Sequence, residues 1–137
     1  MRSQGPRRLD EVVRKMLLGK NYAFLATINR DGSPQVTPTW VDTDGRHVLI
    51  NTALGRVKVN NVCRDPRVAV AVAEQANPER YAMIRGRVVR QIVGKVAEDH
   101  IDKLARKYTG AKRFARQSPD QRRVILTIQP DRVVLPE

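Results

Sequence analysis

The apolar residues near the N-terminus follow a helical spacing. Five of them are spaced so that they share one face of a helix: Leu9, Val12, Val13, Met16 and Leu17. This spacing is typical of a short amphipathic helix. Asp10 and Glu11 lie near its start, where the helix dipole favours negative charge, and Gly19 is a suitable end. We therefore expect a helix over residues 9–17.

After this helix the pattern becomes that of strands joined by tight turns. The segments 22–29, 34–42 and 47–52 are rich in strand-forming residues. Asp31-Gly32 separates the first two segments and Asp44-Gly45 the second two, and an Asp-Gly pair is a strong hairpin signal. The three segments are therefore expected to form a three-stranded antiparallel meander.

The middle of the chain combines a short helix with an apolar strand. Gly55 precedes a polar segment, residues 56–63, that suits one or two helical turns, and Asp65-Pro66 ends it. Residues 68–73 are apolar at every position and β-branched at alternate ones, which predicts a strand buried on both faces. We expect this strand at the centre of a barrel.

The remaining elements complete a single domain over residues 1–137. They are a long strand (81–93), a second amphipathic helix (98–108), a polar basic loop (109–121) and two strands (123–128 and 132–135) around a turn at 129–131. We expect an irregularity of the long strand at Gly86, because glycine within a strand often marks a bulge. Strands in short succession with helices outside the run predict an α+β, mainly antiparallel barrel. A dinucleotide-binding parallel sheet is disfavoured, because no Gly-x-Gly-x-x-Gly follows a strand.

Composition and charge narrow the class of partner. The chain has 137 residues, of which 41% are hydrophobic and 29% charged, as in ordinary globular proteins. Its formal net charge is +12, so it concentrates anions near its surface. Eight basic residues lie between Lys103 and Arg123 with only Asp120 among them. A solvated surface explains such a patch, and so do nucleic acid, an acidic cofactor tail or an acidic substrate.

Several locations and chemistries are disfavoured by the sequence. No apolar run approaches the roughly 20 residues of a membrane span, and the basic N-terminal segment lacks the apolar core of a signal peptide. Cys63 is the only cysteine, which suits a reducing cytoplasm. His47 and His100 are the only histidines, and neither has the spacing of a metal site or of a hydrolytic triad. We therefore expect no metal, and any difficult chemistry must come from a cofactor.

A phosphate site is predicted where the strand ending at residue 52 turns into the short helix. Amide N–H groups at a helix start and the helix dipole together favour an anion. Arg56 can bind phosphate oxygens through two hydrogen bonds, Lys58 adds a point charge, and Thr52 offers a hydroxyl. The alternative is that both basic residues are solvated on a surface helix.

The second constellation is Gln35-Val36-Thr37-Pro38-Thr39-Trp40. Proline cannot donate a backbone hydrogen bond, so this segment is expected at a sheet edge or a bulge. Neighbouring backbone groups are then available to a flat ligand with a polar rim, such as a flavin ring. The alternative is an edge strand that proline protects from aggregation.

Taken in order, these motifs resemble the pyridoxamine 5'-phosphate oxidase-like split-barrel flavoproteins, and within them the class that uses the deazaflavin coenzyme F420. The motifs are Leu25-Ala26-Thr27, Asp31-Gly32-Ser33-Pro34, residues 35–40, Asn51-Thr52, residues 55–61, residues 64–69, Arg85-Gly86-Arg87-Val88 and Tyr108-Thr109-Gly110. The resemblance spans nearly the whole chain. One departure is Val57, where similar deazaflavin-class proteins often have alanine.

The resemblance implies a split β-barrel with two or three peripheral helices that acts as a homodimer with two cofactor clefts at its interface. It places Arg56 and Lys58 on the cofactor phosphate. Gln35, Val36, Thr37 and Pro38, with Trp40, would lie along the ring, and Asn51, Thr52 and Asn61 nearby. It further implies an oxidoreductase that moves hydride between the ring and a small organic substrate; catalytic residues, substrate and direction of transfer stay undefined.

Coenzyme F420 is favoured over FMN, because it carries an acidic oligoglutamate tail that a basic chain attracts. Three alternatives stay open: an FMN-dependent pyridoxamine 5'-phosphate oxidase-like enzyme, a flavin or F420 carrier without turnover, and a basic nucleic-acid-binding module. The last is disfavoured, since only 4% of residues are aromatic and stacking platforms for bases are therefore scarce. Tyr81 and Arg85 are further candidates to reach a cleft across the dimer.

Overall fold

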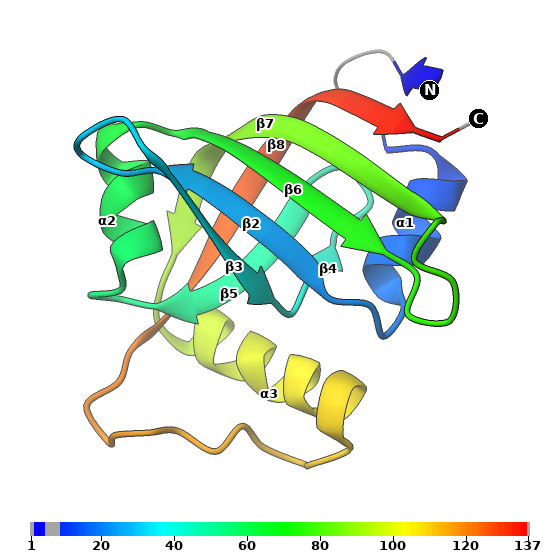
Figure 1. The fold of residues 1–137 in the computed structure, drawn as a ribbon. Coiled ribbons are helices and arrows are strands. Elements are labelled where there is room, and N and C mark those ends of the chain that lie inside the picture. The colour runs from blue at the N-terminus through cyan, green and yellow to red at the C-terminus, as the bar shows by residue number, and fades with distance from the viewer. Residues whose placement is uncertain (1, 5–8, 137) are drawn as a thin grey trace.

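One curled antiparallel sheet organises the molecule, with three helices around it (Figure 1). This computed structural model describes residues 2–4 and 9–136. The elements are β1 (Arg2–Gln4), α1 (Glu11–Leu18), β2 (Ala23–Ile28), β3 (Pro34–Thr39), β4 (Asp42–Thr43), β5 (Val48–Ala53), α2 (Val57–Arg64), β6 (Arg67–Ala73), β7 (Tyr81–Ile92), α3 (Lys95–Thr109) and β8 (Arg123–Leu135). The strand order is β3-β2-β6-β7-β8-β5-β4, and β1 pairs with β8.

All strand pairs described are antiparallel, which confirms the predicted α+β class. The first predicted hairpin is also confirmed, because β2 and β3 pair along their whole length. Gly32 adopts φ +88° in the turn, a conformation that glycine tolerates without strain. The carboxylate of Asp31 accepts hydrogen bonds from both the backbone N–H and the hydroxyl of Ser33, and so fixes the turn.

The predicted three-stranded meander is wrong. The segment 34–42 does not continue as one strand: β3 ends at Thr39, and the chain resumes pairing only in the two-residue β4. β5 pairs with β4 and β8 instead of β3. Pro34 and Pro38 offer no N–H for a second neighbour, so β3 stays at the edge of the sheet, as the proline predicted. β5 lies instead between β4 and β8, the last strand of the chain, and its Val48 and Ile50 are buried.

β6 confirms the predicted interior position but not the predicted burial. It lies between β2 and β7, and Val68, Val70 and Val72 are buried. The alternate residues, Ala69 and Ala71 among them, are only partly buried. The prediction of a strand buried on both faces is therefore wrong for the single chain, because no element of the described chain covers the alanine face.

The irregularity predicted at Gly86 is confirmed. The pairing of β7 with β8 shifts register between Arg85 and Gly86, where Gly86 lies opposite Pro130. A Cβ atom at Gly86 would lie 2.2 Å from the carbonyl oxygen of Gln129, so only glycine fits this approach. The shift leaves Asp131 without a partner in the ladder while pairing resumes on both sides of it, and β8 runs as one strand of 13 residues rather than the two strands predicted.

The helices lie where predicted, with shifted ends. Asp10 caps α1, because its carboxylate accepts a hydrogen bond from the N–H of Val13 at 3.0 Å. α3 begins at Lys95, three residues before the predicted start, after Gly94 at φ +85°. α3 packs against β8 and β5 and lies below the sheet in Figure 1, followed by the polar loop that returns to β8.

Candidate functional site

A cavity of about 220 Å³ lies where the end of β3, β5, the start of α2 and α3 meet. We call it the cation cavity. Its wall is formed by Tyr22, Pro38, Thr39, Trp40, Asn51, Thr52, Arg56, Lys58, Ile101, Phe114 and Arg123. Three of these residues are cationic and three are aromatic, and the list contains no carboxylate. The cavity therefore combines positive charge with flat apolar surface.

The three cations line the same cavity, and two of them, Lys58 and Arg123, are buried while Arg56 is exposed. Lys58 is 8% exposed and Arg123 5% exposed, and among the described residues neither Arg56 nor Lys58 forms an ion pair. Burial lowers the pKa of Lys58, and the positive charges of Arg56 and Arg123 lower it further. Burial, followed by the charge of Arg56, lowers the pKa of Arg123 to about 10, although the carboxylate of Glu98 acts in the opposite direction. An anion in this cavity would relieve the repulsion.

The turn before α2 explains why two of these cations are available. Gly55 adopts φ +90° and turns the chain out of β5. Arg56 is the N-cap residue of α2, yet no side chain caps this end, and the first turn contains no acidic residue. The Val59 N–H donates to the Arg56 carbonyl oxygen at 3.1 Å, and the N–H groups of Val57 and Lys58, which have no acceptor among the described residues, are left for another one. This is the geometry that the sequence predicted for a phosphate, although helix α2 begins at Val57 rather than at Arg56.

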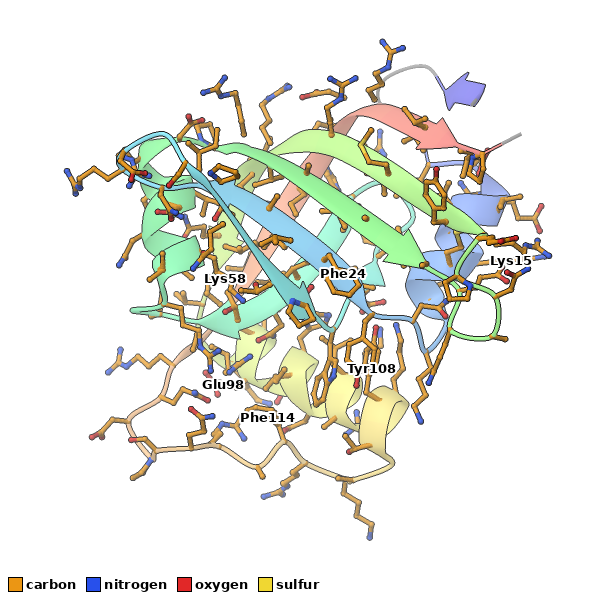
Figure 2. All side chains as sticks on the ribbon, in the orientation of Figure 1. Lys15, Phe24, Lys58, Glu98, Tyr108 and Phe114 are labelled. Atoms are coloured by element: carbon orange, nitrogen blue, oxygen red, sulfur yellow. The ribbon has the colours of Figure 1, made fainter. Side chains whose placement is uncertain are left out.

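Aromatic rings form the wall opposite the sheet. Trp40 stacks on Tyr108 with 5.1 Å between ring centroids and 4° between planes, and Phe114 packs edge-on against Trp40 at 5.8 Å. The Tyr108 hydroxyl accepts a hydrogen bond from the Val41 N–H and donates one to the Asn21 carbonyl oxygen. These contacts fix the indole of Trp40 in place. Figure 2 shows Tyr108 between α3 and the sheet, Phe114 beside α3 near the loop that follows it, and Lys58 beside the end of β3.

A buried hydrogen-bonded network links α3 to the cavity. Asp42 accepts hydrogen bonds from the His100 ring at 3.0 Å and from the Lys103 ammonium at 3.1 Å. Burial raises the pKa of Asp42, but the hydrogen bonds from His100, the Thr43 backbone and Lys103 outweigh burial and bring it down to about 2. The other ring nitrogen of His100 lies 3.1 Å from the side-chain nitrogen of Asn51. Asp42 is therefore charged at neutral pH and holds His100 against Asn51.

The structure brings six of the ten predicted site residues to the cavity wall: Pro38, Trp40, Asn51, Thr52, Arg56 and Lys58. Gln35 and Thr37 point inward from β3, and each has a buried side-chain oxygen without a hydrogen-bond partner among the described residues. Val36 points outward and is 61% exposed. Asn61 does not line the cavity; its amide donates hydrogen bonds to Thr27 and Asn29 and so joins α2 to β2.

The sequence did not indicate several residues of the wall. Arg123 was expected as the first residue of a strand and as the last member of the basic patch, and Tyr22 and Phe114 had no predicted role in a site. Phe114 carried a weak signal, because it is the one apolar aromatic residue of the polar segment 109–121. The place of Arg123 in this cavity could not be predicted, since the pairing of β8 with β5 that brings it to Asn51 is not local in sequence.

The basic segment between Lys103 and Arg123 does not form a single charged face. Arg116 pairs with Glu98 and Asp102, and Lys103 pairs with Asp42. The ammonium of Lys107 donates to the carbonyl oxygens of Leu17 and Val41. Burial is the main cause that lowers the pKa of Lys107, to about 8. Much of the positive charge in this segment is thus used inside the molecule.

A second feature is an apolar sheet surface that no helix covers. Phe24 of β2 lies opposite Pro38 of β3 and Ala71 of β6, and Ala26 lies opposite Val36 and Ala69. We call this surface the outer sheet face. Figure 1 shows no helix in front of β2, β3 and β6. Phe24, labelled in Figure 2, is 46% exposed. A cavity of about 350 Å³ lies on this face, bordered by Arg67 and Arg85.

No helix within residues 2–4 and 9–136 is long and apolar enough to cross a bilayer. In the same ranges, no three histidine, cysteine, aspartate or glutamate side chains gather closely enough to hold a metal ion.

Comparison with known proteins gives consistent results. The family model described as pyridoxamine 5'-phosphate oxidase matches residues 9–135. The structure of a protein named F420 reductase is 29% identical, with a TM-score of 0.78 over 92% of this chain and 98% of its own. A candidate pyridoxamine 5'-phosphate oxidase from Lactobacillus delbrueckii is 21% identical, with a TM-score of 0.62 over 98% of this chain and 99% of its own. General stress protein 26 from Bacillus anthracis is 14% identical, with a TM-score of 0.64 over 93% and 94%.

Proposed function

The chain belongs to the pyridoxamine 5'-phosphate oxidase family, a split β-barrel family, and from that premise we propose that it is an oxidoreductase that binds coenzyme F420 or FMN. The cofactor's phosphate lies on Arg56 and Lys58. One observation carries the proposal: buried cations without a carboxylate partner share a cavity with aromatic side chains. A phosphorylated aromatic ring system matches both features.

The donors around the cavity fit a phosphate. Arg56 offers a planar guanidinium and Lys58 an ammonium at the uncapped start of α2. The Thr52 hydroxyl lines the same cavity and has no hydrogen-bond partner among the described residues. Lys58 is buried, and the positive charges of exposed Arg56 and buried Arg123 act on it, so an anion that binds between these groups relieves their repulsion.

The ring is expected beside Pro38 and Trp40, the two residues of the 35–40 segment that line the cavity. The unpartnered oxygens of Gln35 and Thr37 lie on the same strand and offer acceptors to a polar ring edge if β3 adjusts. When bound, the cofactor supplies hydride transfer, while the chain provides position and electrostatics. The indole of Trp40, fixed by Tyr108, limits where a substrate can approach.

The size of the cavity supports a homodimer. At about 220 Å³ it is smaller than the roughly 300–1,000 Å³ of ligand sites, so a single subunit encloses only part of the ligand. The outer sheet face is the surface available to supply the missing wall. It includes Pro38, which also lines the cation cavity, so a second subunit seated on this face would reach the cavity rim.

F420 is favoured over FMN for two reasons. The chain carries a net charge of +12, which suits an acidic tail. The 29% identical structure is named an F420 reductase. The substrate is a small organic molecule, and the compartment is the cytoplasm.

The test is a cofactor titration of purified protein by fluorescence, with F420 and FMN in parallel. The double substitution Arg56→Ala/Lys58→Ala should weaken binding of both by about 3–6 kcal/mol, from about 1.5–3 kcal/mol for each charged hydrogen bond. Lys15→Ala/Arg80→Ala is the control, because it removes the same charge from residues that do not line the cavity. Equal affinity of the two variants would refute the phosphate site. Binding without hydride transfer to any tested acceptor would leave a carrier instead of an enzyme.

A further inference from the structure

We propose that Arg123 is a third phosphate-binding cation and that Asn51 and His100 are positioning residues that fix its guanidinium toward the cation cavity. Asn51 then acts through Arg123 instead of contacting the cofactor. This inference rests on the proposed function, because it assumes that the cavity receives the cofactor's phosphate.

The guanidinium of Arg123 is held from three sides. Its Nε donates to the side-chain oxygen of Asn51 at 3.0 Å, and one Nη donates to the Asn51 carbonyl oxygen at 3.4 Å. The other Nη donates to Gln121 at 3.2 Å, and the Phe114 ring lies 4.8 Å from the guanidinium carbon. A guanidinium has five N–H donors, and these contacts use three. Two donors, one on each Nη, are left for an anion in the cavity, the arrangement that binds phosphate through two hydrogen bonds.

Both polar groups of the Asn51 side chain already have protein partners. Its nitrogen donates to the Ala97 carbonyl oxygen at 2.9 Å and lies 3.1 Å from His100 Nδ1, and its oxygen accepts from Arg123. A flip of the amide would place its NH₂ against the guanidinium, so the orientation is fixed by both neighbours. Asn51 thus lines the cavity while its polar atoms are directed at protein partners.

His100 connects Asp42 to Asn51, because one of its ring nitrogens must donate a hydrogen bond and the other must accept one. Nε2 faces the Asp42 carboxylate at 3.0 Å, and a carboxylate accepts, so Nε2 carries the proton. Nδ1 is then an acceptor for the Asn51 amide. Asp42 is itself held by the Thr43 backbone N–H at 2.8 Å and by Lys103. The network therefore extends from α3 and β4 to a donor pair in the cavity.

The prediction concerns the phosphate preference, defined as the ratio of the dissociation constants of riboflavin and FMN. If the protein binds only the deazaflavin, the ratio for F420 and its phosphate-free chromophore replaces it. Arg123→Gln should reduce this preference by about tenfold to a hundredfold, the range for one charged hydrogen bond. Asn51→Leu should reduce it similarly, with a larger loss of affinity for FMN than for riboflavin. The double variant should lose no more than Arg123→Gln alone, because both changes remove the same contact.

Two substitutions of His100 form a matched pair of variants, and this test does not depend on whether the Asn51 variant folds. His100→Gln keeps one donor and one acceptor at nearly the same separation and should keep the phosphate preference. His100→Leu removes both and should lose it. Circular dichroism of each variant verifies the fold. A purely structural role would weaken riboflavin and FMN binding alike, and would not be rescued by glutamine.

The results separate the two proposals. If the wild-type protein binds neither flavin nor deazaflavin, the proposed function itself fails, and this inference with it. If it prefers the phosphorylated ligand and Arg123→Gln does not change that preference, only the inference is overturned. Additive losses in the Asn51→Leu/Arg123→Gln protein would likewise overturn the positioning role of Asn51.

Discussion

Phe24 tests whether the outer sheet face closes the site against a second subunit. Fully burying a phenylalanine is worth at most about 3 kcal/mol, and Phe24 is 46% exposed, so covering the rest contributes about 1.4 kcal/mol. In a two-fold symmetric dimer each subunit contributes one Phe24 to the interface, so this free energy is gained twice. Phe24→Ala should therefore weaken dimerisation by about 3 kcal/mol, or about a hundredfold in dissociation constant.

Phe24→Asp should act more strongly, since it also buries two carboxylates that lack partners, each at a cost of several kcal/mol. We expect this variant to be monomeric at micromolar concentration. Val96→Asp is the control, because Val96 is 61% exposed on α3, outside the outer sheet face. Analytical ultracentrifugation gives the oligomeric state, and cofactor titration of the same samples gives affinity.

The two measurements must change together if a partner subunit completes the cavity. Phe24→Asp should lose both dimer and cofactor binding while its circular dichroism matches the wild type. A Phe24→Asp protein that remains dimeric would refute the proposed interface. A folded monomer that binds cofactor with wild-type affinity would show that one subunit encloses the ligand.

Two further predictions concern the fold that supports the site. Gly86→Ala places a Cβ 2.2 Å from the Gln129 carbonyl oxygen and should lower the free energy of unfolding by about 1–3 kcal/mol or more; an unchanged urea midpoint would contradict the close approach. Asp42 has a pKa of about 2 in the fold against 3.8 ordinarily, so its stabilisation, about 2 kcal/mol, is present above pH 4 and lost as pH falls toward 2. Asp42→Asn should flatten the decline in unfolding free energy over that interval, and an unaltered pH dependence would argue against the charged network.

The sequence predictions were correct where the interactions are between residues close in sequence and failed where they are between residues far apart. The hairpin at Asp31-Gly32 and the irregularity at Gly86 depend on local backbone chemistry, and both are confirmed. The pairing of β5 with β8 could not be predicted, because the paired residues are 70 or more positions apart in the sequence. Asn51, for example, pairs with Ile125. The same pairing brings Arg123 beside Asn51, which is why the third cation was missed.

By itself, the sequence determined the antiparallel class, the edge position of the proline-containing strand and the pair Arg56 and Lys58 at a helix start. Each depends on backbone conformation or charge within a few residues, so local chemistry is sufficient. Only the tertiary structure decided which side chains face the cavity, that Asn51 serves Arg123, and that the alanine face of β6 stays uncovered. Those outcomes depend on strand pairing and burial across the whole chain, where the free energy is set by partners far apart in sequence.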